Sequence, residues 1–289
     1  MNFRFSTCAL LCASLFLSCH SNPEEEVTVT VPYTFEVFSA STGSLDDLGT
    51  RGSNDSKPWR LLVFDVKDDK FVQQVERSGD QDFNLLGTVN LDLSFGKHQI
   101  CFLCSNSPWA EFDEQTFQAV WTKDNPLGDV WSKVVVVNVK QGDKDGSQQV
   151  VLDRSVAYVR TTINDKLPQD VYAIRQVMQG GSWTYDVLNQ TGGVASQISY
   201  ENIVAADLKG EKGKSVGIYT FLPDGANSAT SYTVTAYDSL EIILQFHTFT
   251  DVPLVQNQYT NYKGNFFSVA NQFGISLNKD WEPVNYIEY

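Results

Sequence analysis

Two cysteines, Cys101 and Cys104, have the Cys-x-x-Cys spacing that supports redox chemistry in some proteins. They lie in an apolar stretch, residues 98–105, whose composition indicates a β-strand. In a strand, positions three residues apart are separated by about 10 Å and face opposite sides. The Cα atoms of a disulfide lie within about 7 Å of each other. The sequence therefore predicts two buried free thiols.

The three histidines do not form a catalytic pattern. His20 lies near the N-terminus, and His98 and His247 lie inside strand patterns, where a histidine is most often a satisfied core or surface residue. The chain contains no Gly-x-Ser-x-Gly, no His-Glu-x-x-His and no phosphate-cradling glycine loop. We therefore expect no enzymatic activity and no cofactor.

Pairs of acidic residues are the remaining candidates for metal ligands. Asp46-Asp47, Asp68-Asp69 and Asp143/Asp145 lie in expected loops and could hold a hard cation such as Ca²⁺. Turn chemistry explains aspartates beside glycines equally well, and the segment Gly142–Gly146 lacks a fixed downstream glutamate. No metal site is predicted.

Cys19 follows a short apolar segment at the N-terminus. Residues 1–18 carry one charge, Arg4, and an apolar run of the length expected for a signal peptide. That run is shorter than the roughly 20 apolar residues of a membrane-spanning helix. Leu-Phe-Leu-Ser-Cys at 15–19 resembles a bacterial lipobox, which implies cleavage before Cys19, transfer of a diacylglyceryl group to its thiol, and palmitate as part of the lipid. The alternative is an ordinary signal peptide with a chance cysteine.

Residues 19–26 form an acidic, polar tether that begins at this cysteine. It resembles the export signal of surface lipoproteins of Bacteroidota, which implies an outer-membrane anchor with the body at the cell surface. The net charge of −14 opposes binding to nucleic acid, itself a polyanion. No later segment is expected to span a membrane.

The rest of the chain has the pattern of an all-β protein, with turn residues every 8–12 positions and almost no helical periodicity. A short helix could lie within residues 108–129. We predict two tandem β-sandwich domains, over 27–153 and 154–289. Predicted strands are 27–38, 59–66, 71–75, 89–95, 98–105, 134–139 and 148–152, then 155–164, 171–179, 183–188, 216–222, 232–238, 241–248 and 273–277.

Three segments resemble the fimbrillins, the fimbrial subunits of Bacteroides and Porphyromonas. The first is an apolar strand ending in Phe64-Asp65, followed by Leu91 to Asn106 with Gly96-Lys97-His98 inside it. The second is Leu152–Ala157, which is similar to the Leu-x-Arg-x-x-Ala that opens the second domain of that family. The third is Thr250–Phe267, with Val-Pro near its start and Gly264 near its end. We expect Pro253 at a strand start or edge, and Gly264 at a turn before 265–269 returns to the sheet.

The resemblance implies transthyretin-like sandwiches and assembly by strand exchange. A trypsin-like, Arg-specific protease would cut the loop after the first strand, and a strand from another fimbrial subunit would fill the groove left behind. Arg51, followed by Gly52, is the only arginine in the polar stretch 39–57 and matches that processing site. Lys57 is followed by proline, which blocks such enzymes.

The C-terminal tail departs from the pattern of stalk subunits, because only residues 282–289 follow Trp281. A tip, anchor or stand-alone role, with a host or bacterial surface ligand, therefore stays open. The alternative function is a glycan-binding surface lipoprotein, in which Trp109, Trp121, Trp131 and Trp183 would stack on sugars. Exposed tryptophans would favour that alternative, but we expect them to be buried.

Overall fold

The computed structural model describes residues 29–39, 59–79, 86–223, 227–268 and 273–279. The strands are β1 Thr30–Ser39, β2 Trp59–Lys67, β3 Lys70–Gly79, β4 Gly87–Ser94, β5 Gly96–Ser105, β6 Glu111–Asp113, β7 Gln118–Val120, β8 Val130–Val139, β9 Gly146–Arg154, β10 Ala157–Ile163, β11 Ala173–Gly181, β12 Thr184–Asp186, β13 Thr191–Gly192, β14 Ser196–Ile203, β15 Lys214–Thr220, β16 Ser228–Tyr237, β17 Ile243–Pro253, β18 Gln258–Gly264 and β19 Phe273–Lys279. The one helix of this part is the 3₁₀ turn Ala206–Leu208. None of its helices could therefore cross a membrane. The predicted all-β class is confirmed.

The first sandwich is a single bent sheet of order β3-β2-β5-β8-β9-β1-β4. Its two halves are joined only where Trp131 and Ser132 of β8 pair with Arg154 and Asp153 of β9. The sheet folds over at this join, so that β4-β1-β9 faces β3-β2-β5-β8. Alternate residues of both layers form the first core, because side chains along a strand alternate between its faces.

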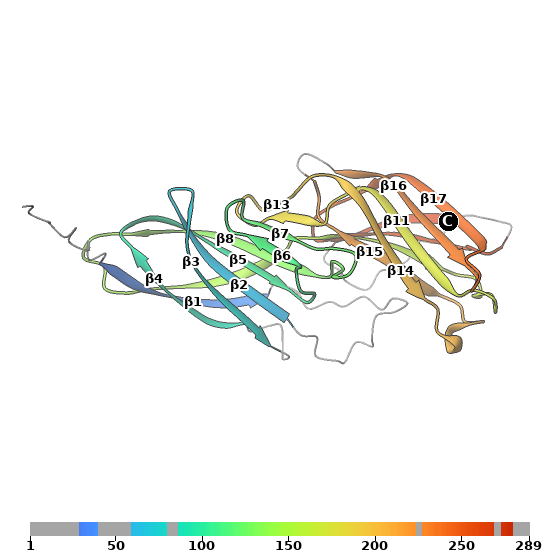
Figure 1. Ribbon diagram of the computed structural model, residues 1–289, viewed down its shortest axis with the longest axis horizontal. Coiled ribbons are helices and arrows are strands. Elements are labelled where there is room, and N and C mark those ends of the chain that lie inside the picture. The colour runs from blue at the N-terminus through green and yellow to red at the C-terminus, as the bar shows by residue number, and fades with distance from the viewer. Residues whose placement is uncertain (1–28, 40–58, 80–85, 224–226, 269–272, 280–289) are drawn as a thin grey trace, which may run out of the picture.

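A third layer covers the outer face of β2 and β5. The small sheet β13-β12-β7-β6 draws strands from both halves of the chain and lies in the middle of the molecule (Figure 1). Leu62 and Phe64 of β2 pack there against Trp121, Tyr185 and other residues of a second core. As a result β2 and β5 are buried on both faces, which explains why their sequences are continuously apolar.

The second sandwich lies beyond this layer, at the right of Figure 1. It consists of the sheets β15-β10-β18-β19 and β14-β11-β16-β17, which enclose a third core. Its strands correspond to those of the first sandwich: β10, β11, β14, β15, β16, β17 and β18 occupy the places of β1, β2, β3, β4, β5, β8 and β9. β19 has no counterpart, because it adds an extra strand beside β18.

Three expectations are wrong. Residues 108–129 contain β6, β7 and turns instead of a helix, since Phe112 and Ala119 serve the covering sheet. The expected loop between 188 and 216 contains β14, which pairs with β11 over most of its length. Residues 265–268 do not return to the sheet, because their backbone N–H groups bond the Asp165 carboxylate instead. Pro253 does lie at the end of an edge strand, as predicted.

Candidate functional site

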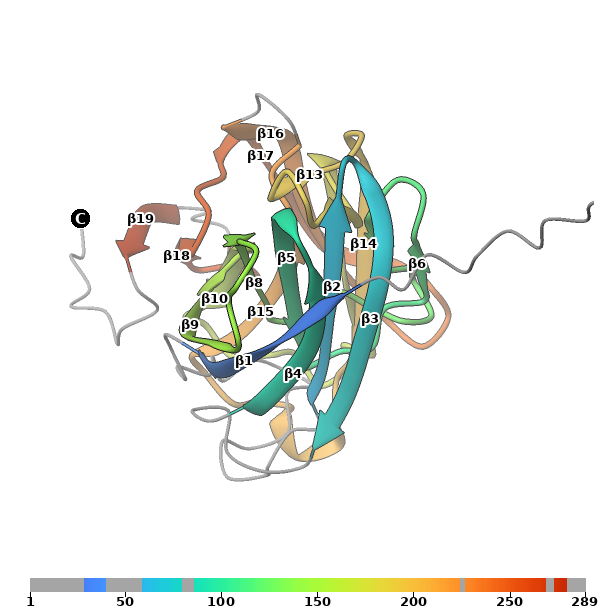
Figure 2. The same ribbon diagram turned by 90° about the vertical axis from the view of Figure 1, so that its left-hand side faces the viewer.

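The place of β1 in the first sandwich is the feature most relevant to assembly. β1 pairs with β4 in antiparallel register from Thr30–Ser94 to Val37–Gly87. On its other side β1 pairs with β9 in parallel register, from Tyr33–Gly146 to Ser39–Leu152. Figure 2 shows β1 and β4 at the end of the molecule nearest the viewer. The first strand of the chain is therefore a central strand, hydrogen-bonded on both sides.

The inward side chains of β1 belong to the first core. Val31, Phe35 and Val37 are buried, and the Phe35 ring meets Phe102 of the facing sheet edge-on with ring centroids 5.5 Å apart. Tyr33 packs where Gly146 leaves room, since a Cβ at position 146 would collide with the tyrosine ring. Full burial of a valine or phenylalanine contributes about 1.5–3 kcal/mol. Apart from its connection along the chain, β1 is thus held in the sheet by hydrogen bonds and side-chain packing.

We call the place that β1 occupies between β4 and β9 the β1 slot. Without β1, its walls would be two edge strands with unpaired backbone groups, and its floor would be core side chains. The floor residues of these two strands are Val89, Leu91, Leu93, Val150 and Leu152. Any extended segment with apolar residues at alternate positions has the chemistry to fill such a slot.

The chain connects β1 forward to β2 only through residues 40–58. The predicted processing residues Arg51 and Gly52 lie in that connection, and they, like the predicted lipidation site Cys19, lie outside the described residues. A cut at Arg51 would leave β1 without a covalent bond to the body that holds it.

The tryptophans proposed as sugar platforms are largely inside the protein. Trp109, Trp121 and Trp131 are buried, as expected, and Trp183 is half-buried against Tyr200 with the two rings stacked at 5.7 Å. The indole N–H groups of Trp121 and Trp183 donate to the carbonyls of Ser107 and Gln197. Three of the four are therefore core residues.

One cavity, of about 230 Å³, opens beside β2, β3 and β6. The Arg60 guanidinium lies over the Trp109 ring, 4.2 Å from its centroid, and pairs with Glu76. Gln74, Glu111, Phe112 and Glu114 complete most of the lining. Because the guanidinium covers the indole face, the cavity offers charged groups to a ligand, and Trp109 is not open for a sugar to stack on.

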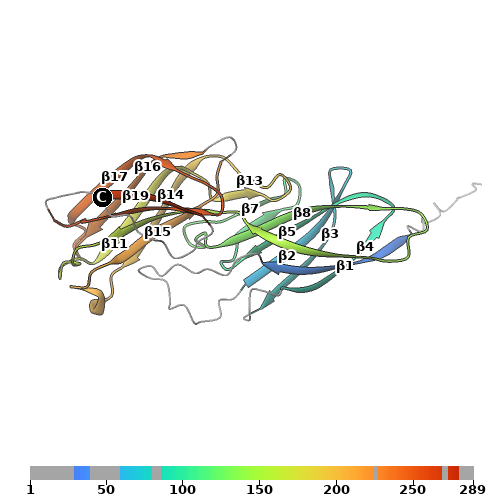
Figure 3. The ribbon, with the colours of Figure 1, turned by 180° about the vertical axis from the view of Figure 1, so that it is seen from behind.

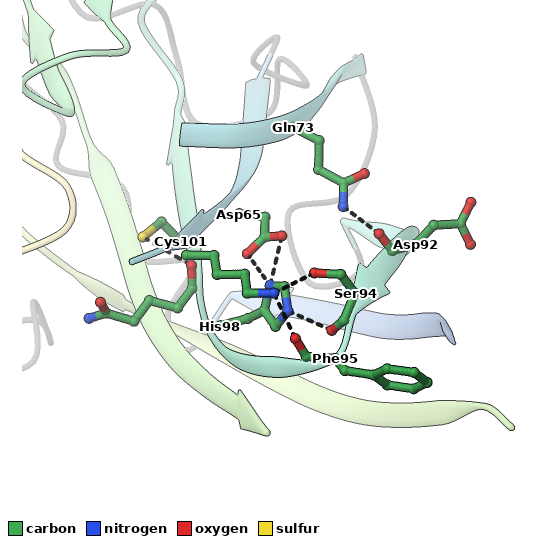
Figure 4. A network of polar contacts seen from close by, with 9 residues as sticks. Asp65, Gln73, Asp92, Ser94, Phe95, His98 and Cys101 are labelled. Atoms are coloured by element: carbon green, nitrogen blue, oxygen red, sulfur yellow. Dashed lines mark hydrogen bonds and ion pairs between the residues drawn. The ribbon is translucent and has the colours of Figure 1, made fainter. Parts of the chain in front are cut away.

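His98 is a buried structural residue, and Figure 4 shows its surroundings. Its Nδ1 lies 2.9 Å from both carboxylate oxygens of Asp65, and its Nε2 donates to the Ser94 carbonyl at 2.8 Å. Lys67 donates to the Ser94 hydroxyl and to the Phe95 carbonyl, which fixes the same corner between β4 and β5. Both ring nitrogens are hydrogen-bonded within the protein, which accounts for the burial of this polar side chain.

The two cysteines are free and buried, as predicted. Cys104 belongs to the core between the two layers of the first sandwich, and Cys101 to the core under the covering sheet, so they face opposite sides of β5. Burial raises the pKa of both thiols far above the usual value. Unreactive thiols of this kind do not support redox chemistry.

The junction between the sandwiches contains a buried ion pair that the sequence did not reveal in full. Arg154 is part of the Leu-x-Arg-x-x-Ala segment, but nothing in the sequence pointed to Asp129 as its partner. Arg154 Nε lies 2.9 Å from an Asp129 carboxylate oxygen, and its guanidinium lies over the Trp131 ring. Nearby, the Ser132 hydroxyl bonds those of Ser155 and Tyr185. Within the described residues no cluster of three or more metal-ligating side chains occurs.

No protein-family model matches the chain, and no curated protein matches it significantly. Solved structures do match the chain. A Bacteroides ovatus protein provisionally described as a cell adhesion protein is 10% identical, with a TM-score of 0.50, over 89% of this chain and 99% of its own. One so described from Bacteroides eggerthii is 8% identical, with a TM-score of 0.50, over 86% and 95%. The fimbrial anchor protein Mfa2 from Porphyromonas gingivalis is 12% identical, with a TM-score of 0.46, over 86% and 97%.

Sequence identities this low are evidence of a shared fold only. The two Bacteroides structures match over nearly their whole length, so the likeness covers both sandwiches rather than one of them. The fold expected from the resemblance to fimbrillins is thereby confirmed, and the chain shares the all-β architecture of these Bacteroides proteins.

Proposed function

We propose that the chain is a fimbrillin-like surface lipoprotein, a structural or accessory (tip or anchor) subunit of fimbriae that assembles by protease-triggered β-strand exchange and takes part in adhesion. Its location is the cell surface or a fimbrium, with Cys19 as the lipid anchor in the outer membrane. Its partners are other fimbrial subunits, an Arg-specific protease and a host or bacterial surface ligand. The role is structural and not enzymatic.

One observation carries the proposal. β1 pairs on both sides and supplies core residues, yet a single cut between 40 and 58 would separate it from the body that it completes. That segment contains Arg51 in a Thr-Arg-Gly context. Loss of β1 would expose the backbone of β4 and β9 and an apolar floor, which together favour capture of another extended strand. The fold shared with proteins described as adhesion proteins agrees with this role.

The glycan-binding alternative loses its main support, because it required exposed tryptophans. Trp109, Trp121 and Trp131 are buried, and the Trp109 face is covered by Arg60. We therefore do not propose it as a second function.

The test begins with residues 20–289 and a trace of Arg-specific protease. We expect one cut, giving a new N-terminus at Gly52, and a compact body that then forms larger oligomers on gel filtration. The variant Arg51→Ala should resist cleavage and stay unassembled. A resistant Arg51 in the parent, or a cut body that stays a monomer after β1 is lost, would contradict the proposal.

A synthetic peptide of residues 30–39 makes the test specific to the slot. Added in excess during cleavage, it should refill the slot and suppress the oligomers. The same peptide with Phe35→Asp should have no effect, because a carboxylate cannot enter the core without a partner. Equal suppression by both peptides would show that assembly does not use the slot.

A further inference from the structure

β17 is the edge strand of its sheet and the longest strand described, with 11 residues. It pairs with β16 from Ser228–Pro253 to Tyr237–Ile243, and no other strand of the described part of the chain pairs with it. It lies in the half of the molecule away from β1 (Figure 3). Its outer backbone groups therefore present an edge that another strand can extend.

The other edge strands of the two sandwiches carry at least one charge each, and charge is a common protection against edge-to-edge pairing. The charged residues are Lys70, Glu76 and Arg77 on β3, Asp92 on β4, Glu201 on β14, Lys214 on β15 and Lys279 on β19. β17 has one charged residue, Asp251, near its end, and residues 242–250 contain no aspartate, glutamate, lysine or arginine. The uncharged run of β17, residues 243–250, is longer than that of any other edge strand in the described part of the chain, so β17 is the edge least protected by charge.

Large apolar side chains are exposed at the start of β17. Leu240 is 77% exposed, Ile242 58%, Ile243 55% and Phe246 58%. The turn that carries them is well ordered, since an Asp238 carboxylate oxygen accepts hydrogen bonds from the backbone N–H groups of residues 240 and 242, both at 2.8 Å. A preordered apolar surface loses little entropy when a partner covers it.

The sheet face beside these residues has the composition of an interface. Tyr237 pairs with Ile243, and the Arg175 guanidinium lies 4.8 Å from the Tyr237 ring centroid while it also pairs with Glu201. Tyrosine and arginine around an apolar centre are typical of protein–protein contacts. The exposed apolar residues are therefore continuous with a surface suited to binding.

The absence of charge indicates which partner fits. Two copies of a chain with a net charge of −14 repel each other over most of their surfaces. Residues 242–250, between Glu241 and Asp251, are an uncharged stretch whose own side chains bring no carboxylate into a contact between two copies. Burial lowers the pKa of His247, so that this residue also adds no charge at neutral pH. A contact of like residues on both sides requires this kind of self-complementary, neutral surface.

We propose that two copies of the chain associate edge to edge, by antiparallel pairing of β17 with β17 of a second copy. The sheet β14-β11-β16-β17 then continues into the same sheet of the other copy, and Ile243 and Phe246 of the two copies cover one another. This contact uses the second sandwich and does not depend on the β1 slot or on cleavage.

The test uses residues 20–289, so that neither the apolar leader nor a lipid drives association, and measures their mass by sedimentation velocity over a concentration series. We expect a reversible dimer that strengthens with added salt, because salt screens the repulsion between two acidic bodies. Phe246→Lys places a charge on the edge and should weaken the dimer at least about tenfold. The matched control Ile203→Lys, on the opposite edge of the same sheet and 53% exposed, should leave the dimer unchanged.

Cross-linking gives a second readout. Gln245→Cys, near the centre of the proposed contact on β17, should form a disulfide between copies under oxidation, and Ser199→Cys on β14 should not. Arg51→Ala should dimerise like the parent, which separates this contact from cleavage-dependent assembly. A parent that is monomeric at every concentration, a dimer insensitive to Phe246→Lys, or equal weakening by Ile203→Lys would each overturn the proposal.

Discussion

β1 and β10 occupy the same place in the two sandwiches, yet they are connected to the rest of the chain in different ways. Each is a central strand with an antiparallel neighbour on one side and a parallel neighbour on the other. β10 reaches β11 through the short connection 164–172, in which Leu167 and Val171 are buried in the core. β1 reaches β2 through the longer segment 40–58.

The start of β10 is also fastened, by the buried pair of Arg154 and Asp129 and by the hydrogen bond from the Ser155 N–H to the Val130 carbonyl. Under the proposed strand exchange, the connections of the first strand matter as well as the slot that it occupies. The connections of β10 include residues of the core and of the junction, whereas the proposed release of β1 requires one cut between residues 40 and 58.

The junction provides the largest test of this difference. Arg154→Met should lower the free energy of unfolding by about 3–5 kcal/mol, because it leaves the Asp129 carboxylate buried without its partner. Urea denaturation would measure the loss. Replacing both partners, as in Arg154→Met with Asp129→Leu, should recover much of it. A loss of less than about 1 kcal/mol in the single variant would show that β10 is not fastened by this pair.

A core substitution in each first strand should separate the two sandwiches. Phe35→Ala should cost about 3–4 kcal/mol, because it leaves a cavity beside Phe102, and Val159→Ala should cost less, because fewer buried atoms are removed. After cleavage at Arg51, Phe35→Ala should also release β1 faster, as followed by mass spectrometry of the released segment. Phe38→Ala, on the outward and half-buried side of β1, is the matched control. Equal effects of Phe35→Ala and Phe38→Ala would contradict the burial pattern.

Alkaline pH should destabilise the first sandwich before the second. Burial raises the pKa of the Cys101 and Cys104 thiols, so the unfolded state loses those protons first and stability falls as pH rises above about 8.5. The corresponding groups of the second sandwich are Tyr200 and Tyr262. Burial raises the pKa of both, to about 12 for Tyr262, so their effect begins only above about 10.

Thiol labelling follows this prediction directly, since both free cysteines of the described chain lie in the first sandwich. Labelling in urea at increasing pH should show that this sandwich unfolds at lower urea concentrations. Its free energy of unfolding should fall by up to about 1.4 kcal/mol per pH unit for each thiol. The double variant Cys101→Ala and Cys104→Ala, followed by tryptophan fluorescence, should lose the dependence between pH 8.5 and 10. Persistence of that dependence would assign it to other groups.

The smallest expected difference concerns a pair of equivalent surface ion pairs. Arg60–Glu76 joins β2 to β3, and Arg175–Glu201 joins β11 to β14 at the corresponding place. Arg175→Ala should cost at most about 1 kcal/mol, because the pair is exposed to solvent. Each guanidinium also lies over an aromatic ring, but Trp109 under Arg60 is buried whereas Tyr237 under Arg175 is half-buried, so Arg60→Ala should cost somewhat more. Thermal unfolding of both variants would measure the two losses of stability, and a larger loss for Arg175→Ala would contradict this prediction.

Local sequence pattern was sufficient for most of the strands and for part of the site. The alternation of valine, threonine and aromatic residues located β1, and the two-residue period of a strand placed Cys101 and Cys104 on opposite faces. The local pattern misassigned residues 108–129, because the short strands β6 and β7 are stabilised by packing against the layer that they cover. The processing and lipidation sites, Arg51 and Cys19, stay predictions.

Only the tertiary structure decided which strands meet. The parallel pairing of β1 with β9 joins residues more than a hundred positions apart, as does the bond between the Glu36 and Gln149 side chains across it. The partners of His98 and Arg154 likewise come from distant strands and loops. The sequence by itself determined most of the strands and the faces of their side chains, because the period of side chains along a strand is local. The β1 slot and the weakly protected edge of β17 depend on strand order, which long-range packing decides.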